Sequence, residues 1–139
     1  MHIAIINGPN LNLTGIREPE TYGKESFDDY IPQLRKEFPE IEISYFQSNV
    51  EGEIINRIQE VGFSAEGIII NAGGYSHTSV AIHDALAAVP APTIEVHLSN
   101  IFAREEYRHH SRISSACRGI IAGLGLDGYR LAIINLTEK

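Results

Sequence analysis

The sequence has little cysteine, no long apolar run and no excess of basic residues. Its only cysteine is Cys117, so no disulfide can form within the chain and a cysteine-built zinc site is excluded. The apolar runs are far too short to span a bilayer, and the N-terminal segment lacks the basic region of a signal peptide. Lys and Arg number 11 against 18 Asp and Glu, a net charge of −7 that disfavours binding to nucleic acid or anionic lipid. We therefore expect a cytoplasmic protein with neither nucleic acid nor membrane as a partner.

Short β-branched apolar runs alternate with segments of helical period along the chain. The 139 residues, 43% of them apolar, suit one soluble domain, so residues 1–139 are expected to form a single domain. The alternation is typical of an α/β fold whose parallel sheet is covered on both faces. Strands are predicted at Ile3–Asn7, Ile41–Gln47, Gly67–Asn71, Thr93–Val96 and Arg118–Ala122, and helices near Asp28–Glu37, Gly52–Val61, Ser79–Val89 and after Gly128.

The usual order for such a small doubly wound sheet of five strands is 2-1-3-4-5. Its switch point lies between the first and third strands, and ligands are expected at their carboxyl ends. Ser26 followed by Asp29 predicts the start of the first helix, while Pro32 predicts that this helix begins late or is kinked.

The loop over residues 7–23, after the first strand, is longer than an ordinary βα connection. It contains Asn10, Arg17 and Tyr22. One interpretation is an Asn/Gly/Pro-rich turn with a surface arginine and tyrosine. Its place beside the switch point favours the other, a lid or active-site loop that supplies Arg17 and Tyr22.

The third strand leads into a glycine-rich turn at residues 71–79 that opens a helix. Asn71 ends the strand, and Gly73 and Gly74 let a ligand approach backbone N–H groups that can receive an oxyanion or carboxylate. The same residues also suit a tight turn capped by Thr78 or Ser79, and the two interpretations are compatible. His77 is either a surface histidine or part of that site.

The next helix presents Ile82, Ala85, Leu86 and Val89 at helical spacing, and these residues should face the sheet. Asp84 lies about 200° round from Ile82 and points away from that core. It is therefore either a solvated acid or a residue that faces a neighbouring subunit.

Polar residues also follow the fourth strand. His97 can exchange a proton, and Ser99 with the backbone there can hold a carboxylate. If this stretch is helical, Arg104 and Arg108 are i, i+4 and share a face that could turn toward an anion. The alternative is a charged surface helix whose Arg and Glu residues pair with each other. The pair His109-His110 resembles a metal-binding tract, but neighbours on a helix diverge by about 100°, so we expect no metal.

A literal G-x-G-x-x-G occurs at residues 123–128, after the fifth strand. Only eleven residues follow it (139 − 128 = 11). The dinucleotide fingerprint needs a further strand and an acidic residue about 20 positions on, so the motif is interpreted as a strand-to-helix turn.

Taken together, these segments resemble type II 3-dehydroquinate dehydratase. The resemblance rests on residues 7–13 and 17–23, Gln47-Ser48-Asn49, residues 71–79, and residues 95–100 with Arg104-Glu105-Glu106, in the family's order and spacing. It implies a flavodoxin-like fold and the dehydration of 3-dehydroquinate to 3-dehydroshikimate through an enolate, in the shikimate pathway of aromatic amino acid biosynthesis. It implies no cofactor.

The resemblance also implies residue roles. Tyr22 would be the base, acting as a phenolate; His97 would donate a proton to the leaving hydroxyl; and Arg17 would favour the phenolate and stabilise the transition state. Substrate contacts would be Asn71, His77, Asp84, Leu98, Ser99 and Arg108, supported by Asn10, Gly73, Gly74 and Arg104. Asp84 would reach the site of an adjacent subunit, in a homo-oligomer of trimers assembled into a dodecamer.

The sequence departs from the family pattern at two positions. Val50 stands where the family frequently has histidine, and His83 where arginine is common, which puts local subunit contacts in doubt. Lys24, Lys36 and Lys139 are not placed to form the Schiff base of the unrelated type I enzymes.

The alternative to an enzyme is a non-catalytic flavodoxin-like domain that binds a small anion at the Gly73-Gly74 turn.

Overall fold

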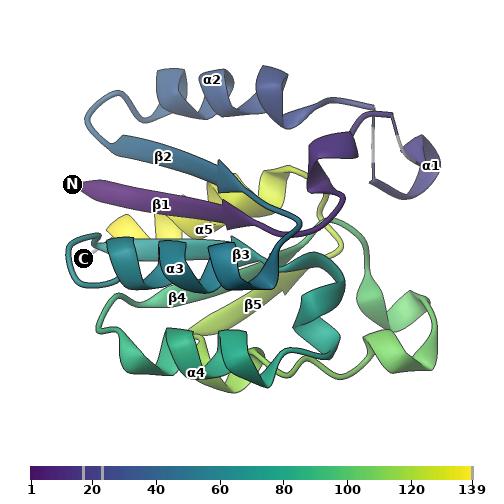
Figure 1. The fold of residues 1–139 in the computed structure, drawn as a ribbon. Helices are drawn as coiled ribbons and strands as arrows, with labels where there is room; N and C mark the ends of the chain where they lie inside the picture. The colour runs from purple at the N-terminus through teal and green to yellow at the C-terminus, as the bar shows by residue number, and fades with distance from the viewer. Residues whose placement is uncertain (17, 23, 139) are drawn as a thin grey trace.

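The structure is a computed structural model that describes residues 1–16, 18–22 and 24–138, with only the backbone for Pro19 and Tyr22. Its centre is a parallel sheet of five strands in the order β2-β1-β3-β4-β5 (Figure 1). The strands are β1 (His2–Asn7), β2 (Glu42–Gln47), β3 (Gly67–Asn71), β4 (Thr93–His97) and β5 (Gly119–Ala122). The predicted α/β class and the strand order 2-1-3-4-5 are confirmed, and the strand bounds agree to within one residue.

Helices cover both faces of the sheet (Figure 1). One face carries α2 (Phe27–Glu37) and α5 (Asp127–Thr137), and the other carries α3 (Glu51–Val61) and α4 (Val80–Ala88). Side chains of β1 alternate between two hydrophobic clusters: Ile3 and Ile5 pack with α2 and α5, whereas Ala4 and Ile6 pack with α3 and α4. Burial on both faces explains why the strands are continuously apolar. Within the described ranges, no helix has the length and apolarity needed to cross a membrane.

The helix starts follow local capping. The Ser26 hydroxyl oxygen accepts a hydrogen bond from the backbone N–H of Asp29 at 3.2 Å, so α2 begins at Phe27 and the predicted late start is wrong. Pro32 lies inside α2 on its exposed side. Of the two candidate caps of α4, Ser79 is the one used, because it accepts from the N–H of Ile82 at 2.9 Å.

The second glycine motif is a strand-to-helix turn, as predicted. Gly123 and Gly125 have φ values of 89° and 61°, which side chains with a Cβ rarely adopt. Their N–H groups donate to the carbonyls of His97 at 3.3 Å and of Leu98 at 3.0 Å. The turn between β5 and α5 therefore fixes the backbone just after β4, where polar residues gather.

Candidate active site

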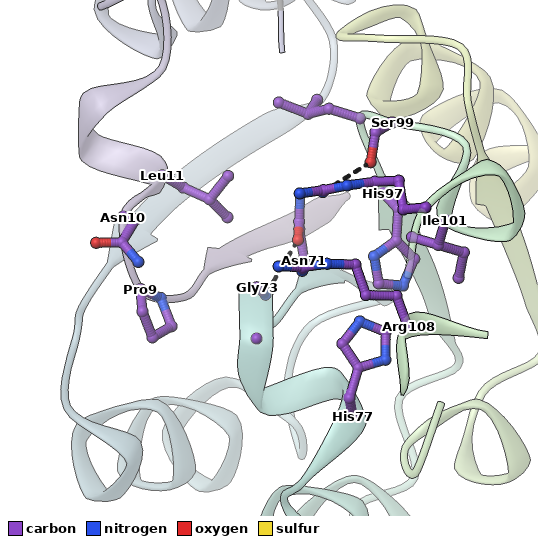
Figure 2. Close-up of a pocket in the computed structure, with 13 residues that line it drawn as sticks. Pro9, Asn10, Leu11, Asn71, Gly73, His77, His97, Ser99, Ile101 and Arg108 are labelled. Atoms are coloured by element: carbon purple, nitrogen blue, oxygen red, sulfur yellow. Dashed lines mark hydrogen bonds between the residues drawn. The ribbon is translucent and has the colours of Figure 1, made fainter. Parts of the chain in front are cut away.

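A pocket lies where the carboxyl ends of β1, β3 and β4 meet, at the predicted switch point (Figure 2). Most of the site residues expected from the sequence line it, and all of them leave the same edge of the sheet or the loop after β4. Its lining is Pro9, Asn10, Leu11, Asn71, Gly73, Gly74, His77, His97, Leu98, Ser99, Ile101, Arg104 and Arg108. Pro9, Leu11 and Ile101 were not expected from the sequence, because their apolar side chains carry no chemical signal.

Three expected site residues are not among the lining residues. Arg17 lies outside the described residues, and Tyr22 is described only by its backbone, at the end of the short helix α1 (Pro19–Tyr22). Asp84 is on α4 with its side chain 72% exposed, and its Oδ1 lies 3.0 Å from Nδ1 of His83. It points away from the core formed by Ile82, Ala85 and Leu86, as the helical spacing predicts, and the structure does not bring it into the pocket of its own chain.

The ring of His97 contacts a buried carboxylate that was not predicted from the sequence. Glu95 is fully buried, and its Oε2 lies 2.5 Å from Nε2 of His97. Burial raises the pKa of Glu95, but hydrogen bonds from His97, Ser114 and Ser111 together lower it below its usual range. The carboxylate is therefore ionised at neutral pH. Since Nε2 is engaged, Nδ1 is the ring nitrogen of His97 left to exchange a proton with a ligand.

The position of Glu95 two residues before His97 is the sequence feature that could have indicated its role. Alternate residues of a strand lie on the same face, so a glutamate two positions before His97 faces the same way. An acidic residue inside an otherwise apolar strand needs partners when it is buried. Ser111 and Ser114, which supply them, lie far along the chain and carry no signal of this kind.

His77 stands beside His97 on one side of the pocket, opposite Pro9, Asn10 and Leu11 (Figure 2). The two rings are stacked, with centroids 6.0 Å apart. Nδ1 of His77 lies 2.9 Å from the backbone carbonyl oxygen of His110. A carbonyl only accepts, so Nδ1 carries the hydrogen.

Burial lowers the pKa of His77, and the nearby His97 and Arg108 lower it further, although the His110 carbonyl opposes the shift. The ring is therefore neutral at pH 7. With its hydrogen on Nδ1, Nε2 of His77 is an acceptor, suited to a ligand hydroxyl.

The two arginines reach the pocket, but not from one helix. The predicted helical spacing of Arg104 and Arg108 is wrong: the chain forms two 3₁₀ turns, η3 (Ile101–Ala103) and η4 (Glu106–Arg108), with extended backbone at Arg104 and Glu105 between them. His109 holds this corner, because its Nε2 lies 3.0 Å from the carbonyl oxygen of Arg104.

Each arginine is oriented by a side-chain hydrogen bond. Arg104 donates from Nη1 to the Ser99 hydroxyl oxygen at 3.3 Å, and Arg108 donates from Nε to Oε2 of Glu105 at 2.7 Å. The expected pairing with a glutamate thus occurs for Arg108, and Nε of Arg104 also lies 3.9 Å from Oε2 of Glu105, while both arginines still line the pocket. Two guanidinium groups line the pocket, Arg104 beside Ser99 and Arg108 beside Glu105, and they give it a cationic character that suits a carboxylate.

The glycine-rich turn after β3 opens a 3₁₀ helix, η2 (Gly73–His77), rather than α4. Gly73 has a φ of 60°, and a Cβ there would lie 3.0 Å from the carbonyl oxygen of Pro9. Gly74 has free space around its Cβ position. The N–H of Gly73 donates to Oδ1 of Asn71 at 3.1 Å, so the turn orients Asn71.

Beneath the pocket, buried polar groups join the ends of β1 and β3. Asn7 pairs in register with Asn71 across the two strands and is fully buried. Its Oδ1 accepts from the Tyr129 hydroxyl at 2.7 Å, and its Nδ2 donates to the Tyr45 hydroxyl oxygen at 3.2 Å. Tyr129 reaches this point from α5, so a helix on one face fixes the floor of the pocket.

The adjacent histidines His109 and His110 make separate contacts. The ring of His109 contacts the Arg104 carbonyl, and the carbonyl of His110 contacts His77. In the part of the chain that the structure describes, no group of three or more His, Cys, Asp or Glu side chains is arranged to hold a metal ion.

Fold and site together define a flavodoxin-like α/β protein with a cationic, histidine-containing pocket at its switch point. The family described as dehydroquinase class II matches residues 1–137. The 3-dehydroquinate dehydratase of Fusobacterium nucleatum is 56% identical over 144 residues, covering 99% of this chain and 97% of that protein. The 3-dehydroquinate dehydratase of Sulfurovum sp. is 53% identical over 140 residues, covering 99% of this chain and 86% of that protein.

A solved structure agrees with the sequence relatives. The crystal structure of type II dehydroquinase from Butyrivibrio crossotus is 47% identical and covers 99% of this chain and 98% of its own, with a TM-score of 0.95. The chain belongs to the class II dehydroquinase family.

Proposed function

We propose that the pocket is the active site of a 3-dehydroquinate dehydratase, which eliminates water from 3-dehydroquinate to give 3-dehydroshikimate. As a member of this family, the chain is a hydro-lyase of the shikimate pathway. The observation that most supports this site is the buried Glu95–His97 pair at the switch point, beside Arg104 and Arg108. It supplies a proton donor next to a cationic anchor for the substrate carboxylate.

The reaction needs a base to remove the proton next to the ketone. A free phenol has a pKa of about 10, so only about one in a thousand is ionised at neutral pH. We assign the base to Tyr22 as a phenolate, and assign Arg17, on the same loop, as the cation that favours it. The phenolate takes the proton, and the electrons of the C–H bond move to the ketone oxygen as an enolate.

The second step expels the hydroxyl group. The enolate collapses, the C–O bond breaks, and the leaving hydroxyl takes a proton from His97, so the products are water and the conjugated ketone. The Glu95 carboxylate beneath the ring stabilises the charged imidazolium that must donate this proton. The water formed carries a proton from His97, and the proton taken by Tyr22 then returns to His97 through solvent, so both residues regain their starting states.

The remaining lining residues bind the substrate. Leu98 and Ser99 offer backbone and hydroxyl donors for the carboxylate, with Arg104 bonded to Ser99. The substrate hydroxyls fit Arg108, Asn71 and the acceptor Nε2 of His77. Asn10, Gly73 and Gly74 shape the opposite wall and turn of the pocket.

The assembly is also proposed. We assign Asp84 to the site of an adjacent subunit, in trimers built into a dodecamer; its exposed position on α4, outside the pocket of its own chain, supports this. We further propose that residues 1–139 act as one catalytic domain, since both hydrophobic clusters pack on one sheet, and that the enzyme works in the cytoplasm without a cofactor.

Replacement of Tyr22 tests the assigned roles. Tyr22→Phe should abolish turnover of 3-dehydroquinate while the affinity for the product 3-dehydroshikimate, measured by titration calorimetry, stays within a few-fold of wild type. Tyr30, which lies on α2 and does not line the pocket, provides the matched control, and Tyr30→Phe should leave turnover unchanged. Full activity of Tyr22→Phe would exclude Tyr22 as the base, and an inactive wild type that still binds the product would favour the anion-binding module.

A further inference from the structure

We propose that Ser111 and Ser114 are positioning residues of the proton donor, which hold the Glu95 carboxylate in one orientation and through it orient His97. This inference rests on the proposed role of His97 as the acid. It goes beyond that role by assigning a function to a segment that does not line the pocket.

The contacts saturate the carboxylate. The Ser111 hydroxyl donates to Oε2 of Glu95 at 2.8 Å, and the Ser114 hydroxyl donates to Oε1. Nε2 of His97 shares Oε2 at 2.5 Å. An ionised carboxylate accepts only, so both hydroxyls must be the donors. Each carboxylate oxygen therefore has its own serine, and rotation about the last bond of Glu95 would break at least one of these bonds.

The segment that carries the serines is itself firmly anchored. Ile113, between them, is fully buried, and the N–H of Arg112 donates to the carbonyl of Ser76 at 2.7 Å. The carbonyl just before Ser111 is that of His110, which binds Nδ1 of His77. Residues 110–114 thus set the orientation of both histidine rings, His77 through a carbonyl and His97 through Glu95.

The charged groups around the Glu95–His97 pair explain why uncharged hydroxyls suit Glu95 as hydrogen-bond donors. His77 and Arg108 face it from the pocket, and Arg104 lies beyond Ser99. Below it, burial and the Glu95 charge raise the pKa of Cys117 to about 12, so this thiol is uncharged. Serine hydroxyls stabilise the anion without adding a cation that would compete with His97 for it.

The test measures kcat and KM of Ser111→Ala and Ser114→Ala at neutral pH. Loss of one donor to a buried anion should lower kcat about tenfold with KM within twofold, because substrate contacts are untouched. Ser64→Ala, an exposed serine-to-alanine change, is the control and should match wild type.

A double-mutant cycle separates positioning from a general loss of structure. In a Glu95→Gln background the anion is gone, so Ser114→Ala should change kcat much less than it does in wild type. Ser114 begins the 3₁₀ turn η5 (Ser114–Ala116) and Ser111 lies in the loop before it, so a folding failure in one variant leaves the other to decide. Wild-type kcat in both Ser111→Ala and Ser114→Ala, with His97→Gln inactive, would overturn this inference alone. An active His97→Gln would overturn the proposed acid as well.

Discussion

The buried carboxylate under His97 gives the sharpest quantitative prediction. Glu95→Gln keeps the side chain's shape but removes its charge and replaces one acceptor oxygen with an N–H donor. The wild-type carboxylate is fully buried and accepts from His97, Ser111 and Ser114. Bonds to a charged group are worth about 1.5–3 kcal/mol and neutral ones about 0.5–1.5 kcal/mol, so the change weakens the hold on the imidazolium by roughly 1–2 kcal/mol.

That difference corresponds to a fall in kcat of roughly five- to thirtyfold, because each 1.36 kcal/mol is a factor of ten. KM should change less than twofold, since Glu95 does not line the pocket. The assay is the initial rate of product absorbance in the ultraviolet over a range of 3-dehydroquinate concentrations. Glu40→Gln, which removes an exposed carboxylate, is the matched control and should behave as wild type.

A Glu95→Gln variant with kcat within twofold of wild type would refute the reasoning, because it would show that His97 donates its proton without a carboxylate partner. A large rise in KM with unchanged kcat would refute it too. That result would place Glu95 among the groups that bind substrate rather than among those that prepare the acid.

Three further predictions concern the fold around the pocket. Tyr129→Phe leaves the Oδ1 of buried Asn7 without its donor and should lower the free energy of unfolding by about 1–3 kcal/mol in urea titrations at fixed protein concentration. Gly73→Ala should destabilise by about 1–3 kcal/mol because its φ is 60°, whereas Gly74→Ala, with open space, should cost less than about 0.5 kcal/mol. The pKa of the Glu95 carboxyl is lower in the folded protein than in the unfolded chain, so ionised Glu95 stabilises the fold at pH values above 4.5, the ordinary pKa of a glutamate. This stabilisation is lost as the pH falls through the lowered pKa. The thermal unfolding temperatures of wild type and Glu95→Gln should therefore converge in acid.

The fold was accessible from sequence because its signals are local and repeated. Each strand is a short β-branched run, and each covering helix has a 3.6-residue apolar period, so the parallel sheet and its switch point follow from pattern alone. The position of His97 and Asn71 at strand ends then places them together, as the structure has them. Asp84 was likewise predictable as a residue turned away from its own core.

What the sequence could not provide depends on contacts between distant segments. The hydrogen bond between the His109 ring and the Arg104 carbonyl stabilises a bend in the chain at Arg104. The i, i+4 spacing of Arg104 and Arg108 therefore suggested a helix, but the chain forms 3₁₀ turns there instead. Glu95 looks like an ordinary acidic residue until Ser111 and Ser114 are brought to it by the fold. Pro32 was also a misleading signal, because the Ser26 cap fixes the start of α2 upstream of it.

The measurement that tests the central claim most directly is turnover of 3-dehydroquinate by the purified chain, with and without borohydride pretreatment. A proton-transfer mechanism through Tyr22 and His97 predicts formation of the conjugated product at the same rate in both samples, because no imine is formed with a lysine. Loss of turnover after borohydride would contradict that mechanism. Absence of turnover from the folded protein would contradict the dehydratase assignment itself.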